Sequence, residues 1–178
     1  MSGNVALVLG AGPRVGASVA QKFSSNGYKV AIASRSGTGS KTTEGFLSLR
    51  ADFTKPDSVP ALFDAVKNEF KKAPSVFVYN AAALTNPPDK DSIFSIPSGS
   101  VVSQCQHYYF HAYERQGDGK SKGLALDGAA HGEFFAQLAN HEGNVPWHAT
   151  FVKDKGYVQF KQQDRAGMKT WGIFIVRS

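Results

Sequence analysis

The sequence predicts an α/β fold built on a doubly wound parallel sheet, and three patterns carry this prediction. Residues 5–9, VALVL, form a continuous apolar run that ends at Gly10, as in a strand buried on both faces. Val15, Val19 and Phe23 then recur every four residues, which is typical of a helix with one buried face. Strand and helix patterns continue to alternate over the N-terminal half, as the crossovers of a parallel sheet require.

The same patterns define the other elements of this half. The dipeptide NG at Asn26 and Gly27 ends the first helix. Asp57 or Ser58 can cap a second helix. The buried face of that helix carries Val59, Leu62, Phe63, Val66 and Phe70. Three further strands are expected, at residues 30–33, 47–53 and 75–79.

Beyond residue 92 the patterns are weaker. The aromatic stretch HYYFHAY at residues 107–113 is expected to form a strand. A capped helix is predicted from Asp127 to Asn140. Residues 148–160 are predicted to be extended, with a turn near Asp154 and Gly156.

Composition narrows the class of protein. A chain of 178 residues suits one domain, and no run of 18 apolar residues or secretory signal pattern is present. One cysteine, Cys105, cannot form an internal disulfide, which indicates a reducing compartment, and we expect the cytoplasm. The net charge is +6, but no Lys/Arg run exceeds two residues, so we expect neither a nucleic-acid partner nor a membrane partner.

One local charge bias stands out. Residues 1–43 contain no Asp or Glu. The basic residues of this segment are Arg14, Lys22, Lys29, Arg35 and Lys41. This segment is therefore suited to an anionic ligand.

The turn between the first strand and the first helix is a candidate site for that anion. It carries Gly10, Gly12 and Gly16. At such a junction, free backbone N–H groups and the positive end of the helix dipole point at one place. Gly10 permits the tight turn, and Gly16 permits close packing of helix on strand. The context of strand, glycine turn and helix predicts a dinucleotide site.

The end of the second strand indicates which dinucleotide is bound. An NAD site places Asp or Glu about 20 residues after the glycine turn, on the ribose 2′-hydroxyl. This chain has no carboxylate before Glu44 and offers Ser34 and Arg35 instead. A guanidinium binds a 2′-phosphate through charge-assisted bonds of roughly 1.5–3 kcal/mol each, and Arg14 can add another donor. We therefore predict NADP(H) as the cofactor, in preference to NAD(H).

Four stretches together resemble the short-chain dehydrogenase/reductase family, whose fold is of the Rossmann type. They are LGAGPRVG at residues 9–16, ASR at 33–35, ADF at 51–53 and YNAAA at 79–83. In the family pattern G-x3-G-x-G, Gly10 and Gly16 match the outer glycines and Arg14 stands at the middle one. This resembles the GAGP variant of the motif, which in the family goes with NADP preference.

The resemblance implies roles for further residues. Asp52 would bind the adenine amino group, Phe53 would lie near the adenine ring, and Asn80, Ala81 and Ala82 would line the nicotinamide ribose. The residues expected to contact the cofactor are Gly10, Gly12, Arg14, Val15, Gly16, Ser34, Arg35, Asp52, Phe53, Asn80, Ala81 and Ala82.

The catalytic set of the family is missing from the predicted positions. Family members transfer hydride between NADPH and a carbonyl or alcohol, using a Ser, a Tyr and a Lys four residues after the Tyr. Here residues 1–103 resemble the cofactor-binding half and 107–160 resemble a C-terminal remnant, whereas 161–178 match nothing in the family. The central segment, with two helices and two strands, therefore looks absent around Cys105 to His107, and we expect an impaired enzyme with no assigned catalytic residue.

Other candidate groups are weaker. Tyr157 and Lys161 satisfy Y-x-x-x-K, but their surroundings predict a strand or loop, where this spacing does not bring the two side chains together. His107 and His111 have a metal-like spacing without a third ligand, so no metal is predicted. Cys105 has no neighbouring cation that would activate the thiol.

Two alternatives to an impaired reductase stay open. The chain could be a non-enzymatic module that senses NADP(H), or a splice or gene-model product without a function of its own. By the same resemblance, the missing central segment implies that the fourth strand loses its neighbour in the sheet. Apolar surface would then be exposed, and we expect marginal stability and no dimer of the family type.

Overall fold

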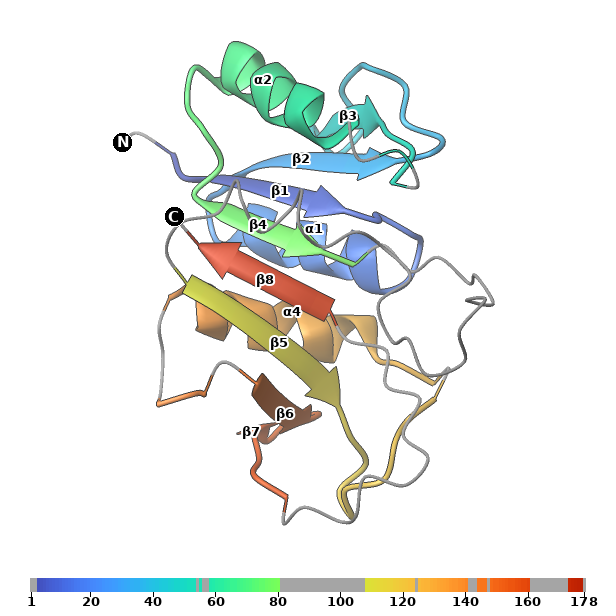
Figure 1. Ribbon diagram of the computed structural model, residues 1–178, viewed down its shortest axis with the longest axis vertical. Helices are drawn as coiled ribbons and strands as arrows, with labels where there is room; N and C mark the ends of the chain where they lie inside the picture. The colour runs from blue at the N-terminus through green and yellow to red at the C-terminus, as the bar shows by residue number, and fades with distance from the viewer. Residues whose placement is uncertain are drawn as a thin grey trace.

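The computed structural model describes residues 3–53, 55, 58–80, 108–123, 125–140, 144–146, 148–160 and 173–177. In Figure 1 these residues form a sheet with helices packed on both of its faces. Its strands are β1 Val5–Leu9, β2 Lys29–Ser34, β3 Leu47–Arg50, β4 Val76–Tyr79, β5 Tyr108–Glu114, β6 His148–Val152, β7 Gly156–Tyr157 and β8 Ile173–Arg177. The helices are α1 Val15–Ser25, α2 Ser58–Phe70 and α4 Gly128–Ala139.

The eight strands follow the order β3-β2-β1-β4-β8-β5-β6-β7. Strands β3, β2, β1 and β4 are parallel, as are β5 and β6. The order β3-β2-β1-β4 is that of the first four strands of a doubly wound Rossmann sheet, 3-2-1-4. The fold class predicted from the sequence is therefore confirmed.

Side chains of β1 supply both layers of the core. Ala6 and Val8 belong to a cluster with the buried faces of α1 and α4. Val5, Leu7 and Leu9 belong to a second cluster, with side chains of β2, β4 and α2. All five residues of β1 have no exposed surface, as expected for the central strand of a sheet covered on both faces.

The helices lie close to their predicted bounds. Val15, Val19 and Phe23 of α1 are buried, and Asn26 caps its C-terminus, followed by Gly27 at φ +83°. Helix α4 begins after Asp127, whose carboxylate accepts a hydrogen bond from the Ala130 N–H at 3.0 Å. Of the helices in the described part of the chain, none combines the length and apolar composition that crossing a lipid bilayer takes.

The third strand is shorter than predicted. It ends at Arg50 and not at Phe53, since its partner β2 also ends, at Ser34. Asp52 instead begins a turn, in which its carbonyl oxygen accepts the Lys55 N–H at 2.9 Å.

The expectation that β4 has no neighbour is wrong. Strand β8, from the tail that matched nothing in the family, lies antiparallel between β4 and β5. Its sequence, IFIVR, is rich in β-branched residues, which favour strands. The pairing hides two rows of backbone N–H and C=O groups that would otherwise form open sheet edges. Within the described residues, β8 joins the N-terminal and C-terminal parts of the sheet (Figure 1).

The central position of β8 is testable by a proline substitution. Ile175 pairs with Val78 on one side and Phe110 on the other. Ile175→Pro removes a ladder hydrogen bond inside the sheet, and we expect it to lower the free energy of unfolding by about 3 kcal/mol or more. Chemical denaturation and light scattering would measure the lost stability and the association of exposed edges.

The matched control is Thr43→Pro, at an exposed position in the turn that the Gly45 N–H closes on the Thr42 carbonyl. Proline fits the second position of such turns, so the stability of this variant should be close to that of the wild type. Equal stability of the two proline variants would show that β8 is not part of the folded sheet.

Candidate functional site

The turn after β1 is held by the ends of both neighbouring strands. Gly10 has φ +79°, which favours glycine, and its N–H donates to the Ala33 carbonyl of β2 at 2.9 Å. On the other side, the Asn80 side-chain amide donates to the Gly10 carbonyl at 3.0 Å, and the Asn80 N–H donates to Leu9 at 2.8 Å. The position of the turn is therefore determined by β2 and β4 together.

Gly16 allows α1 to lie directly on this turn. A Cβ atom at Gly16 would lie 2.6 Å from both the Ala11 Cα and the Gly10 carbonyl oxygen, which no side chain tolerates. Gly12 differs, because a Cβ atom there would meet none of the described residues within 4 Å. Gly16 is thus required by the fold, whereas Gly12 leaves open space above the turn.

The N-terminus of α1 follows this turn, and its first backbone N–H groups have no acceptor inside the helix. The Ala17 N–H donates to Gly12 at 3.0 Å and the Ser18 N–H to Arg14 at 3.2 Å. Among the described residues, no acceptor lies within hydrogen-bonding geometry of the Val15 and Gly16 amides. With the positive end of the helix dipole, these amides make a site suited to an anion.

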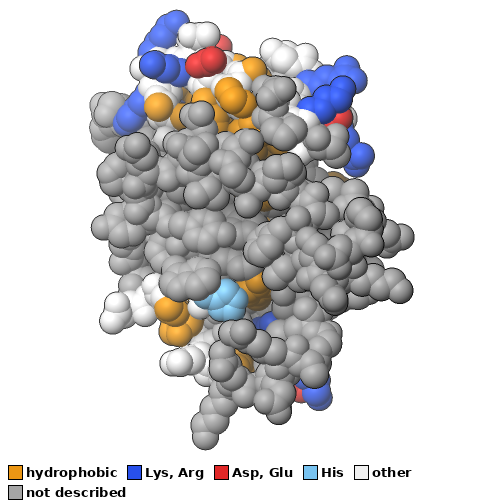
Figure 2. Space-filling model, viewed as in Figure 1, with side chains coloured by type: hydrophobic (Ala, Val, Ile, Leu, Met, Phe, Trp, Pro, Cys, Tyr) orange, Lys and Arg blue, Asp and Glu red, His pale blue; other side chains and the backbone are white. Residues whose placement is uncertain are grey.

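The end of β2 lies beside the turn and carries no carboxylate. Arg35 and Arg14 are exposed, and Ser34 is half-buried, with its hydroxyl 3.3 Å from that of Ser36. The loop that follows is tied to β3, where the Gly39 N–H donates to the Ser48 carbonyl at 2.8 Å. Figure 2 shows Lys and Arg side chains beside hydrophobic ones at the end of the molecule where Figure 1 places α2 and β3.

The other predicted cofactor residues are placed as follows. Phe53 is half-buried, and its ring lies edge-on to Tyr79, with 6.1 Å between the centroids. The Asp52 carbonyl accepts the Ser58 hydroxyl at 2.9 Å, which fixes the start of α2. Burial raises the pKa of the Tyr79 phenol above its ordinary value, so this group stays protonated. Ala81 and Ala82 lie outside the described residues.

The weaker candidates of the sequence gain no support. Tyr157 lies in the short strand β7, and Lys161 lies outside the described residues, as do Cys105 and His107. In the described ranges, no three His, Cys, Asp or Glu side chains gather as metal ligands would.

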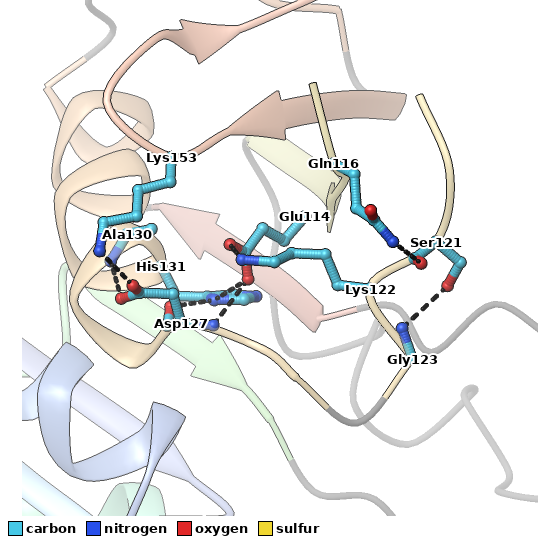
Figure 3. Close-up of polar contacts among 9 residues, drawn as sticks. All are labelled: Glu114, Gln116, Ser121, Lys122, Gly123, Asp127, Ala130, His131 and Lys153. Carbon is cyan, nitrogen blue, oxygen red and sulfur yellow. Dashed lines mark hydrogen bonds and ion pairs between the residues drawn. The ribbon is translucent and has the colours of Figure 1, made fainter. Parts of the chain in front are cut away.

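A buried polar cluster, which the sequence analysis missed, lies where β5 ends and α4 begins (Figure 3). The Glu114 side chain has no exposed surface, and its two oxygens accept from the Lys122 ammonium at 2.6 Å and the Asp127 N–H at 2.8 Å. His131 Nδ1 lies 2.7 Å from the Asp127 carbonyl and 3.6 Å from the Glu114 carboxylate. Because a carbonyl only accepts, Nδ1 carries the hydrogen.

Pairing and burial shift the pKa values of two groups in this cluster. Pairing with the Lys153 ammonium at 2.7 Å, together with the Ala130 N–H, lowers the pKa of Asp127 to about 2. Burial lowers the pKa of His131, which therefore stays neutral near pH 7. Two features of the sequence point to this cluster: Glu114 ends a buried strand, and Asp127 caps the next helix.

Known proteins are similar to this chain in sequence and in fold. No family model matches it. A short chain dehydrogenase/reductase from Cryptosporiopsis sp. (strain 8999) is 24% identical over 238 residues, covering 90% of this chain and 96% of that protein. A Caenorhabditis elegans protein named "Probable 2,4-dienoyl-CoA reductase 3" is 36% identical over 91 residues, covering 46% of this chain and 29% of that protein.

A solved structure adds the fold. A short-chain dehydrogenase/reductase from Sinorhizobium meliloti 1021 matches with a TM-score of 0.53 at 16% identity, over 88% of this chain and 97% of that chain. The likeness in sequence to the Cryptosporiopsis protein extends over nearly all of both chains, although the 238 aligned positions exceed the 178 residues here. The present chain therefore lacks residues that this relative has, and it is similar in sequence to a short-chain dehydrogenase/reductase over most of its length.

Proposed function

We propose that this chain binds NADP(H) at the turn between β1 and α1 and transfers hydride poorly or not at all. Two observations carry the proposal: a Cβ atom at Gly12 would meet no described residue within 4 Å, and the first two amides of α1 have no acceptor among the described residues. A pyrophosphate brings negative charge and acceptor oxygens to that place, which is what the amides and the helix dipole favour.

The preference for NADP(H) rests on charge at the end of β2. A ribose bound beside Ser34 would bring its 2′-oxygen close to Arg35, and the first 43 residues contain no carboxylate to repel a phosphate there. Arg14, exposed at the start of α1, adds positive charge at the turn itself. Charge-assisted bonds to a phosphate are among the stronger hydrogen bonds of proteins.

The proposed loss of catalysis rests on the sequence. The family's Ser, Tyr and Lys set has no counterpart in sequence context, and this chain is shorter than its alignment with the Cryptosporiopsis relative. A tyrosine with its ordinary pKa near 10 needs a lysine beside it to act as an acid or base at neutral pH. A cytoplasmic protein of one domain that binds NADP(H) without turnover would act by reporting the level or redox state of this cofactor.

Exchange of Arg35 for alanine tests the cofactor preference. We expect Arg35→Ala to weaken NADPH binding about tenfold, since one charge-assisted bond is lost, and to leave NADH binding nearly unchanged. Fluorescence titration of the purified protein would measure both dissociation constants. Lys67→Ala is the control, because Lys67 is exposed in the last turn of α2 and gives the same change of charge. An equal effect of both variants would contradict the proposal.

Two glycine variants separate binding from folding. Gly12→Val places a side chain in open space, so the protein should fold with wild-type stability yet lose NADPH binding. Gly16→Ala forces α1 away from the Gly10 carbonyl, so both stability and binding should fall. Thermal melts and NADPH titrations measure the two properties. Wild-type affinity in Gly12→Val would place the dinucleotide elsewhere.

Turnover of carbonyl substrates tests the catalytic part. We expect NADPH oxidation with a panel of aldehydes and ketones to stay at the background rate without enzyme. Tyr157→Phe should leave this rate unchanged, because Tyr157 lies in β7 and not on a helix that would pair it with a lysine. Measurable turnover that disappears in Tyr157→Phe would show that this tyrosine is catalytic.

A further inference from the structure

The first turn of α4 packs directly against the start of α1. A Cβ atom at Gly128 would lie 2.5 Å from the Ser18 hydroxyl and 2.8 Å from the Arg14 carbonyl oxygen, so the backbones touch there. One turn further along α4, a Cβ atom at Gly132 would lie 3.1 Å from the Ser18 carbonyl oxygen. The position of α4 therefore limits where the first turn of α1 can lie.

The Arg14 carbonyl is the backbone group through which α4 contacts the start of α1. It accepts hydrogen bonds from both the Ser18 N–H at 3.2 Å and the Ser18 hydroxyl at 2.9 Å. Arg14 is also the residue at which the glycine turn passes into α1. A shift of this carbonyl would move the neighbouring Val15 and Gly16 amides at the start of α1.

The polar cluster fixes the first turn of α4 from the other side. The Asp127 carboxylate caps the helix through the Ala130 N–H and pairs with Lys153 in the turn between β6 and β7. The Asp127 N–H donates a hydrogen bond to the Glu114 carboxylate at the end of β5. These contacts connect the start of α4 to two strands, as the labelled side chains in Figure 3 show.

The cluster is rigid because its charges are paired in a buried place. Glu114 has no exposed surface, and Lys122 and the Asp127 N–H satisfy its oxygens. The His131 ring lies edge-on to Phe135 and Phe151, with centroids 5.8 and 4.9 Å away. A buried carboxylate cannot move off its partners without a large desolvation cost.

We propose that Asp127 and Glu114 are positioning residues, which hold the first turn of α4 so that Gly128 sets the place of the Arg14 carbonyl and of the amides after it. Their role in cofactor affinity rests on the proposed dinucleotide function. Their role in fixing the position of the first turn of α1 can be measured in the protein without any ligand.

The first test enlarges the contact itself. Gly128→Ala adds a methyl group against Ser18 and Arg14, while alanine favours a helix more than glycine does. We expect the Ala17 and Ser18 amides of the free protein to exchange hydrogen about tenfold faster, and NADPH to bind about tenfold more weakly. Gly117→Ala is the control, because a Cβ atom there meets nothing within 4 Å.

The second test changes the cap. Asp127→Ala removes the acceptor for the Ala130 N–H, whereas Asp127→Asn keeps an acceptor there and loses only the charge. We expect the alanine variant to reproduce the effects of Gly128→Ala and the asparagine variant to restore most of the wild-type behaviour. Asp118→Ala is the control, since Asp118 pairs with Lys120 in the same connection.

The outcomes separate this proposal from the proposed function. Unchanged exchange of the Ala17 and Ser18 amides in both Gly128→Ala and Asp127→Ala would overturn the positioning role. Faster exchange in both variants, with wild-type protein that does not bind NADPH, would support the positioning of the turn and refute the dinucleotide function. Faster exchange together with unchanged NADPH affinity would overturn the link between the cluster and the cofactor.

Discussion

The contact between Gly16 and the backbone of Gly10 and Ala11 is the constraint on which the N-terminal part of the structure depends. A Cβ atom at residue 16 would lie 2.6 Å from the Ala11 Cα and from the Gly10 carbonyl oxygen. For this reason only glycine allows α1 to start directly on the turn after β1. That start determines which face of α1 meets the sheet and where its amides point. It also determines where α4 can pack, because α4 touches Arg14 and Ser18.

The C-terminal part is held to this core by two different contacts. Strand β8 fills the place between β4 and β5, antiparallel to both. On one face of the sheet, α4 packs against α1, so that Phe134 and Phe135 share a cluster with Val19 and Phe23. The buried Glu114 cluster then determines how the start of α4 faces the glycine turn. The proposed site at the ends of β1, β2 and β4 is in this way connected to residues of β5 and α4, which come later in the chain.

The parts of this structure that depend on neighbours in the sequence were predictable. The apolar run of β1, the four-residue spacing of α1 and the cap at Asp127 each report a local preference that the tertiary structure keeps. The pairing of β8 was not predictable, because the IFIVR stretch shows strand propensity but not its partner. The early end of β3 at Arg50 follows from the length of β2, which the third strand's own residues do not show.

The candidate site also contains residues that the sequence identified and contacts that it did not. Gly10, Gly16 and Arg35 were identified from a motif, and the geometry around Gly10 and Gly16 explains why glycine stands there. The Glu114, Lys122 and His131 contacts join β5, the connection after it and α4, so the sequence signals at Glu114 and Asp127 did not show which side chains pair. Their charges are tolerated only because burial and pairing occur together.

Calorimetric titration of the wild-type protein with NADPH and with NADH tests the central claim most directly. We expect saturable binding of one NADPH per chain, with an affinity about tenfold or more above that for NADH. This preference should shrink as the salt concentration rises, because exposed arginines supply it. Equal affinity for the two cofactors would contradict the role given to Arg35 and Arg14. No binding of either one would contradict the assignment of the glycine turn as a dinucleotide site.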